Sequence, residues 1–384
     1  MAYNTKNQIY EKEIIVSNID KEIPTGTCKA TINKKNTEIE IEANDNVKIV
    51  KYEYYNDNKL LVSNINNKYE ISEKIEANNS ILVKVYDEAG NYADIKCEII
   101  DKSFHEPITP PANDNVIFKG ETDTLKAYIS KKSGYYLTRI WVKDAYSQFN
   151  KAVSPEYGIN LYRPIDLLKK EIVNKNLQDK LIVGFNASGF YLKDVYDKSS
   201  VSRYPAFDKT SLGTIVINNG QVVRNAYNHS YVQWFITGFT KDNKMVVFED
   251  NIATTAEEIA AKQQWSQTVL NSGIRNTYTF ASLVISNGQK LTSFGKRMPD
   301  LSNNTVKNLQ LMCQINENNY LLFTSSGVSR KKAIDVFLQL GCQTAVNLDG
   351  GGSIALLYKD KNSMEFKTVI GGGRQLPETG YIVE

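Results

Sequence analysis

Residues 340–358 read LGCQTAVNLDGGGSIALLY, and this stretch decides how the C-terminal part of the chain is built. A helical pattern ends at Gly341, an apolar strand-like run leads to Asp349, three glycines follow, and a second apolar run begins. Consecutive glycines cost conformational entropy on folding, but they let backbone N–H groups approach a ligand closely. The stretch therefore predicts a strand, a ligand-binding loop edged by Asp349, and a return strand. The structural alternative is a glycine-rich turn in which Asp349 only accepts turn N–H bonds.

The rest of residues 115–384 alternates strand-like and helix-like segments. Asn219-Gly220 and Asn287-Gly288 each separate two β-branched runs, a strong hairpin signal. Amphipathic patterns with start or stop residues predict helices at 162–176, 255–273 and 328–342. We therefore predict an α+β class for this region, with a mixed, mostly antiparallel sheet and flanking helices.

The N-terminal part of the chain differs in pattern. Residues 1–20 form a polar arm, and residues 21–102 hold short β-rich runs separated by Asn, Asp and Gly, as in a small β-sandwich. Its last hairpin, residues 87–91, reads DEAGN and resembles that of bacterial Ig-like repeats. Residues 103–114 form a Pro-rich linker. We therefore predict an all-β Ig-like sandwich, a linker, and a second domain over 115–384.

Bulk properties exclude several classes of partner. The net charge is +3 without a basic block, so we predict no nucleic-acid binding. No run approaches the 18 or so apolar residues of a membrane span, and no signal peptide begins the chain. We expect an extracellular or virion-associated protein that is released by lysis or as part of a particle.

The four cysteines form no CxxC pair, and the chain has only two histidines, so a zinc cluster is not expected. Cys28 and Cys97 bracket the first domain, and the sequence leaves open whether they form a disulfide. Cys313 and Cys342 lie in apolar runs and are predicted to be buried thiols. We predict no cofactor and no metal ligand cluster, although a calcium ion at Asp349 stays open.

Two further segments carry candidate binding residues. In GFNASGFY an apolar strand breaks into small polar residues at Asn186 and Ser188, which leaves room for a ligand or forms an ordinary turn. Three glycines precede Arg374, whose guanidinium suits phosphate recognition, and Glu378 follows. His229 could shuttle protons near neutral pH, or it is simply exposed in an Asn-rich loop.

These segments together resemble the phosphodiester glycosidase family. The most specific match is the L-G-x-x-x-A-x-N-L-D-G-G-G-S run, which carries over Asp349 and Ser353. The strand ending N-A-S-G carries over Asn186, and the closing R-x-x-x-x strand carries over Arg374 and, less securely, Glu378. Two arginines of the family pattern are missing, because residues 307–313 read KNLQLMC and residues 324–327 read TSSG.

The resemblance implies hydrolysis of a glycosyl-phosphodiester bond, and a teichoic-acid-like polymer or phosphoglycosyl group of a cell surface is the expected substrate. Asp349 would be the catalytic carboxylate and Glu378 its partner. The groups expected to bind substrate are Asn186, Ser188, Gly350, Gly351, Gly352, Ser353, Arg374 and His229. The missing arginines and the missing signal favour a second interpretation, a non-catalytic glycan-binding protein of a phage or prophage tail. A third is a structural component that contacts other particle proteins.

Overall fold

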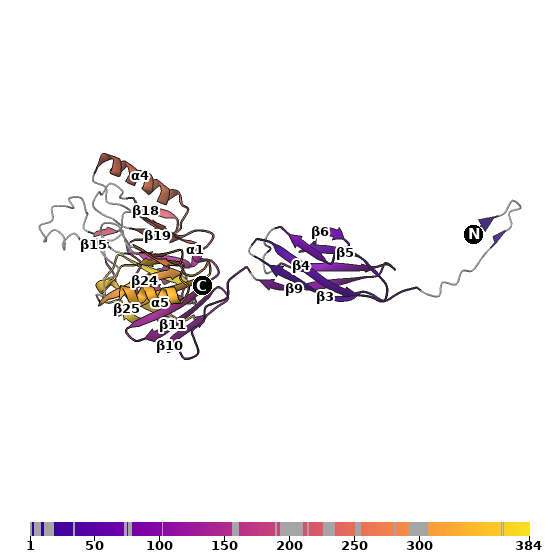
Figure 1. The fold of residues 1–384 in the computed structure, drawn as a ribbon, viewed down its shortest axis with the longest axis horizontal. Coiled ribbons are helices and arrows are strands. Elements are labelled where there is room, and N and C mark those ends of the chain that lie inside the picture. The colour runs from indigo at the N-terminus through magenta and orange to yellow at the C-terminus, as the bar shows by residue number, and fades with distance from the viewer. Residues whose placement is uncertain are drawn as a thin grey trace. The chain divides into compact units, whose positions relative to one another are not determined.

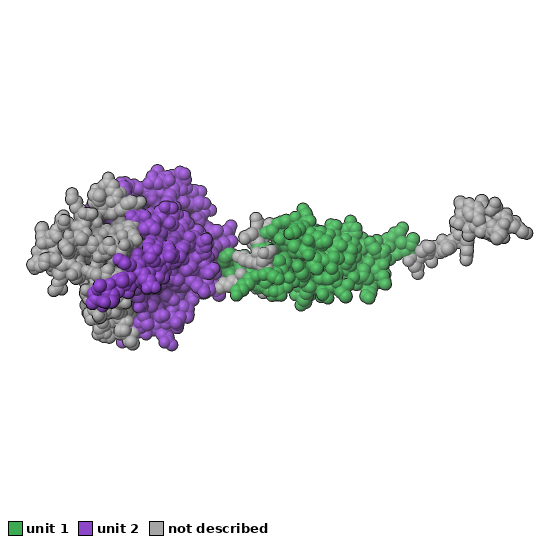
Figure 2. All heavy atoms as spheres, turned by 90° about the horizontal axis from the view of Figure 1, so that it is seen from above, with its two compact units in different colours: residues 1–104 green, residues 105–384 purple. Residues whose placement is uncertain are grey.

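The computed structural model describes residues 2–3, 9–10, 19–33, 35–72, 75, 79–101, 103–155, 161–188, 190–192, 210–212, 215–225, 235–249, 255–279, 282–291, 306–361, 363 and 365–384. It divides into two compact units, Met1–Phe104 and His105–Glu384, which are coloured separately in Figure 2.

Unit 1 is built of strands. A short antiparallel pair, β1 (Ala2–Tyr3) and β2 (Ile9–Tyr10), precedes the main sheet arrangement. The other strands are β3 (Thr25–Ile32), β4 (Thr37–Asn44), β5 (Ile49–Asn56), β6 (Lys59–Asn64), β7 (Lys68–Ile71), β8 (Ile81–Asp87) and β9 (Tyr92–Asp101). Their order is β6-β5-β8-β9-β3-β4-β7.

Strand β9 joins the two layers of this unit, because its first half pairs with β8 and its second half runs parallel to β3. Alternating residues of β3 and β4 on one side and of β5 and β8 on the other form one buried apolar cluster. The predicted all-β sandwich is therefore confirmed. Cys28 and Cys97 lie opposite each other in the β3–β9 register and form a disulfide, which settles the open question.

Unit 2 contains two large antiparallel sheets, and strands β10, β11, β24 and β25 of the first are labelled in Figure 1. The first has the order β10-β11-β12-β25-β24-β26-β22-β23. Its strands are β10 (Val116–Glu121), β11 (Leu125–Lys132), β12 (Tyr135–Val142), β22 (Ser282–Ser286), β23 (Gln289–Lys290), β24 (Val306–Gln314), β25 (Asn319–Ser329) and β26 (Thr344–Asn347). The second has the order β13-β29-β14-β27-β28. Its strands are β13 (Phe149–Val153), β14 (Ile182–Phe185), β27 (Ala355–Lys359), β28 (Lys367–Gly371) and β29 (Glu378–Val383).

Smaller elements complete the unit. Three strands pair in the order β20-β19-β21, and two hairpins are separate. These strands are β15 (Phe190–Leu192), β16 (Thr210–Leu212), β17 (Ile215–Asn218), β18 (Gln221–Asn225), β19 (Ile236–Phe239), β20 (Met245–Phe248) and β21 (Tyr278–Thr279). The described α-helices are α1 (Ala145–Gln148), α2 (Pro164–Asn174), α4 (Ala256–Asn271) and α5 (Arg330–Gln339), and Gly351–Ser353 form a 3-10 turn.

The predicted helices and hairpins have the expected local causes. Thr255 and Glu258 form a reciprocal capping box at the start of α4, and Ser329 caps α5 through the N–H of Lys332. Both Asn-Gly turns have positive φ at each residue, for example 52° at Asn219 and 78° at Gly220. Such turns match the twist of the strands that they join, so the local signals place β17–β18 and β22–β23 correctly.

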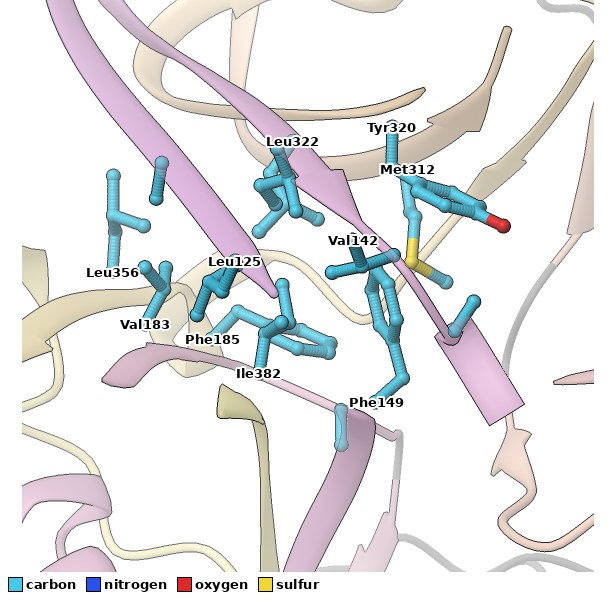
Figure 3. Packing of buried hydrophobic residues seen from close by; sticks show 14 of the residues in the cluster. Leu125, Val142, Phe149, Val183, Phe185, Met312, Tyr320, Leu322, Leu356 and Ile382 are labelled. Carbon is cyan, nitrogen blue, oxygen red and sulfur yellow. The ribbon is translucent and has the colours of Figure 1, made fainter. Parts of the chain in front are cut away.

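The main core of unit 2 lies between the two large sheets. Leu125, Val142 and Leu322 of the eight-stranded sheet meet Phe185 and Ile382 of the five-stranded sheet in one buried cluster (Figure 3). Helix α5 packs on the outer face of the first sheet, and α2 packs on the outer face of the second. Each helix covers part of one face, while the sheets cover each other.

The prediction of an α+β class is therefore wrong: the chain is mostly β. The periodicity that identified three helices says nothing about what the strands pack against, and here strand faces bury one another.

The prediction of two buried thiols is also wrong, because Cys313 of β24 and Cys342 form a disulfide beneath α5. Their apolar surroundings were predicted correctly, but not their proximity.

The segment that follows Phe104 lies along unit 2. The backbone N–H groups of His105 and Ile108 donate to the side-chain oxygens of Asn318 and Asn319, each at 2.9 Å. Asp114 pairs with buried Arg139 at 3.2 Å.

In the described part of the chain, no helix is both long and apolar enough to cross a membrane.

Candidate active site

Three strand ends meet at one edge of the five-stranded sheet. Phe185, the last residue of β14, lies opposite Leu356 near the start of β27 and opposite Gly380 near the start of β29. The loops beyond these ends are therefore brought together by strand register. They are the segment after β14, the loop from Asp349 to Ser353, and the loop that leads into β29.

Glycine is required at two positions of the Asp349 loop. A Cβ atom at Gly350 would lie 2.6 Å from the backbone oxygen of Asn308, which is closer than such atoms approach. Gly351 has a φ of 61°, in the left-handed region that side chains rarely adopt. The loop thus packs tightly against β24 and turns sharply, and the prediction that its N–H groups approach a ligand stays a prediction.

Two amide side chains hold this loop in place. The Nδ2 group of Asn186 donates to the backbone oxygen of Asp349 at 2.9 Å, and that of Asn308 donates to the backbone oxygen of Gly351 at 3.0 Å. Asn186 is fully buried. The predicted association of Asn186 with the Asp349 loop is thus a direct contact, with Asn186 bonded to the loop backbone.

Burial raises the pKa of the Asp349 carboxyl above its ordinary value. Hydrogen bonds from Ser353 and Asn186, the positive charge of Arg374 and the N–H of Gly350 all act in the opposite direction. The carboxyl is therefore only partly exposed and sits among donors that favour its ionised form. Such opposing effects on the pKa are typical of functional carboxylates, because burial raises the pKa while nearby donors and cations lower it.

Arg374 lies at the far end of the loop. Its Nη1 donates to the hydroxyl of buried Ser353 at 3.4 Å, and its side chain approaches Gly352. Asp349, Ser353 and Arg374, three of the predicted site residues, therefore form one group. The carboxylate and the guanidinium come from two different loops, which the hydrogen bond between Arg374 and Ser353 joins.

A family model described as phosphodiester glycosidase matches residues 179–382, more than half of the chain. The chain belongs to the phosphodiester glycosidase family. The match contains β14, the Asp349 loop and β29, the elements that form the site.

Solved structures similar to this chain share little sequence with it. The catalytic domain of zebrafish N-acetylglucosamine-1-phosphodiester alpha-N-acetylglucosaminidase is 15% identical, covers 73% of this chain and 87% of its own, and has a TM-score of 0.42. A hypothetical protein from Synechocystis is 10% identical, covers 93% and 76%, and has a TM-score of 0.41. A putative exported protein from Burkholderia pseudomallei is 9% identical, covers 94% and 96%, and has a TM-score of 0.31. No curated protein matches. Because all three scores are below 0.5, membership in the phosphodiester glycosidase family rests on the family model.

Gln310 stands in the segment where the family pattern has an arginine. Its Oε1 accepts from the N–H groups of Asn186 and Ala355 at 3.2 and 3.3 Å, and its Nε2 donates to the oxygen of Ala355 at 2.9 Å. This fully buried side chain ties β24 to the ends of β14 and β27. Its amide group therefore takes part in the backbone structure of the site.

Glu378 has a buried partner that the sequence did not identify. Its Oε2 lies 3.2 Å from Nζ of Lys151, which also donates to the backbone oxygen of Thr277 at 2.7 Å. Both charged side chains are almost inaccessible to water. Burial lowers the pKa of Lys151, and the Glu378 charge opposes this effect. In β13 this lysine stands between Asn150 and Ala152, neighbours that do not distinguish a buried cation from an exposed one.

The other predicted site residues are placed as follows. Ser188 is buried, and its hydroxyl accepts from the N–H of Thr279 at 2.9 Å. Glu378 contacts Lys151, and among the described residues it makes no contact with Asp349. His229 lies outside the described residues. The catalytic and binding roles of these residues stay predictions.

Several buried oxygens around these strand ends have no hydrogen-bond partner among the residues that the structure describes. They are Asn186 Oδ1, Thr279 Oγ1, Glu378 Oε1 and Thr379 Oγ1. Buried polar atoms in native proteins nearly all have partners. A polar ligand that reached these strand ends would find polar atoms without a protein partner.

Proposed function

We propose that this protein hydrolyses a glycosyl-phosphodiester bond, cleaving between an anomeric carbon and a phosphodiester oxygen. The observation that carries the proposal is the group formed by Asp349 and Ser353 of one glycine loop and Arg374 of the neighbouring loop before β29. It combines a partly buried carboxylate with a hydroxyl, a guanidinium and backbone N–H groups, as the reaction requires.

The departing phosphate needs hydrogen-bond donors that stabilise its negative charge more than it needs a strong acid that protonates it. A phosphate monoester has a second pKa of about 6, so it leaves more readily than an alcohol. Arg374, the Ser353 hydroxyl and the N–H groups of the loop stabilise the charge that develops on it. Asp349 either stabilises the oxocarbenium-like centre or activates the attacking water.

The substrate that we propose is a cell-surface polymer with sugar-phosphate linkages, such as a teichoic-acid-like chain, or a phosphoglycosyl group. The N-terminal all-β unit, which we expect to act as a spacer, supports a setting outside the cell or on a virion. A phage or prophage tail, where the chain contacts other particle proteins, fits that setting.

The test measures sugar released from glycosyl-phosphodiester substrates, including purified teichoic-acid-type polymer. Wild type is compared with Asp349→Ala and with Asp242→Ala, which changes an exposed aspartate in the β19–β20 turn. Release by wild type and Asp242→Ala but not by Asp349→Ala supports the proposal. Equal release by all three proteins excludes a role for Asp349.

A glycan-binding protein without catalysis is the second candidate, and Gln310 is the observation that favours it. Its side chain provides hydrogen bonds to the backbone in a segment where the family pattern has a cation. Retention of wild type on the polymer with no sugar released would establish this alternative and exclude the hydrolase.

A further inference from the structure

Arg330 begins helix α5 and contacts the strand that leads to Asp349. Its Nε donates to Oδ1 of Asn347 at 3.2 Å. Asn347 is buried, and its own Nδ2 donates to the backbone oxygen of Leu348 at 2.8 Å. Because Asn347 is held on both sides, it fixes the guanidinium at the end of β26, beside a residue that precedes Asp349 by two positions in the chain.

This guanidinium lacks a counter-charge. In the described ranges no carboxylate pairs with Arg330, and the first turn of α5 contains no acidic residue. Lys331 and Lys332 follow directly, so the positive charge there is concentrated. Burial lowers the pKa of Arg330, which indicates a cation that has lost part of its hydration. Cations removed from water are normally paired with an anion or with several acceptors.

The Asp349 loop is thus flanked by an arginine at each end. Arg330 contacts Asn347 just before the loop, and Arg374 contacts Ser353 at its end. Guanidinium groups suit phosphate because their planar N–H donors match its oxygens. A phosphodiester has two non-bridging oxygens, so two arginines separated by backbone N–H groups match its charge and its acceptors.

We propose that Arg330 binds the phosphate of the ligand together with Arg374. This deepens the proposed function and rests on it, because it identifies the phosphate rather than the sugar as the group recognised here. It also provides a second cation for a site in which Gln310 bonds to the backbone.

The experiment measures binding of inorganic phosphate to the full-length chain by titration calorimetry. The variants are Arg330→Met and Lys331→Met, the latter changing an exposed lysine in the same helical turn. Loss of a charge-assisted contact is expected to weaken phosphate binding about tenfold or more in Arg330→Met. Lys331→Met is expected to bind within about twofold of wild type, since exposed charges contribute little. Equal loss in both variants, or no loss in Arg330→Met, overturns the proposal.

Arg330→Lys decides the question if Arg330→Met does not fold. Lysine keeps the charge but not the Nε bond to Asn347, so weaker phosphate binding than wild type supports the proposal and equal binding overturns it. Phosphate binding is measured without turnover. A wild type that binds phosphate through Arg330 but releases no sugar would refute the hydrolase while leaving this inference intact.

Discussion

The side-chain amide of Asn186 donates a hydrogen bond to the backbone oxygen of Asp349 across 2.9 Å. These residues are 163 positions apart in the chain and come from different sheets, so the bond joins the end of β14 to the loop after β26. The position of the candidate catalytic carboxylate therefore depends on a residue that need not take part in the reaction.

Asn186→Ala removes this bond and leaves the loop oxygen without its donor. We expect kcat to fall by about 100-fold, since a displacement of about 1 Å in a catalytic group has such an effect. Stability should fall by about 1–3 kcal/mol, as for a buried group left unpaired. Sugar-release kinetics and denaturant unfolding measure the two effects.

The comparison variant is Asn308→Ala, which loses the equivalent bond to Gly351. Its bond lies in a more exposed position, so its effects on kcat and stability should be smaller. An Asn186→Ala protein with the kinetics of wild type would show that this bond does not position Asp349.

Asp349→Asn should stabilise the protein at neutral pH while abolishing activity. Because burial raises the folded-state pKa of Asp349, folding favours its protonated form. This group therefore favours the folded state fully below the ordinary carboxyl pKa of about 3.9, and that contribution is lost as the pH rises through the folded-state value. At neutral pH the wild type carries a partly buried charge that asparagine lacks.

Thermal unfolding of wild type and Asp349→Asn across this pH range checks the sign. The variant should have the higher Tm at neutral pH, and the difference should shrink as the pH falls toward about 4. Asp242→Asn, an exposed change, should show no such convergence. A neutral-pH Tm below that of wild type would mean that the donors around Asp349 outweigh its burial.

The sequence predicted what local patterns determine. Helix α4 follows from the Thr255 capping box, and the β17–β18 hairpin from Asn219-Gly220. The glycine loop followed from the cost of glycine, and its grouping with Asn186 and Arg374 followed from the family resemblance.

What the sequence did not predict depends on distant contacts. The mostly β architecture arises because the faces of two sheets bury each other, and strand alternation is the same whether a helix or a sheet lies opposite. Cys313 and Cys342 are 29 positions apart, and only the fold brings them together. Lys151 has the sequence pattern of a surface lysine, and its burial results from its packing against Thr277 and Glu378.

Gln310→Arg, which restores an arginine in the segment where the family has one, should destabilise the protein. Arginine has donors only, so the buried N–H of Ala355 would lose its acceptor, whereas that of Asn186 would keep its bond to the backbone oxygen of Ala355. Each buried group left unpaired costs about 1–3 kcal/mol. Denaturant unfolding should show this loss, whereas Gln343→Arg on the surface should be neutral. An equally stable Gln310→Arg protein would show that β24 is not held through this amide.

The buried pair Lys151–Glu378 gives the last prediction. Removing one partner leaves an uncompensated buried charge, so Lys151→Met and Glu378→Met should each destabilise the protein by about 3–5 kcal/mol. The double variant has no buried charge and should be much more stable than the sum of the two losses implies. Lys119 and Glu121 form a pair at the same 3.2 Å but in water, and Lys119→Met should cost less than about 1 kcal/mol.

Activity of the double variant then separates structure from catalysis. If Glu378 is the catalytic partner of Asp349, sugar release stays lost in the double variant although its stability has recovered, because no carboxylate remains there. If Glu378 only balances Lys151, sugar release returns together with stability. Additive losses of stability in the cycle would instead show that the two buried charges do not depend on each other.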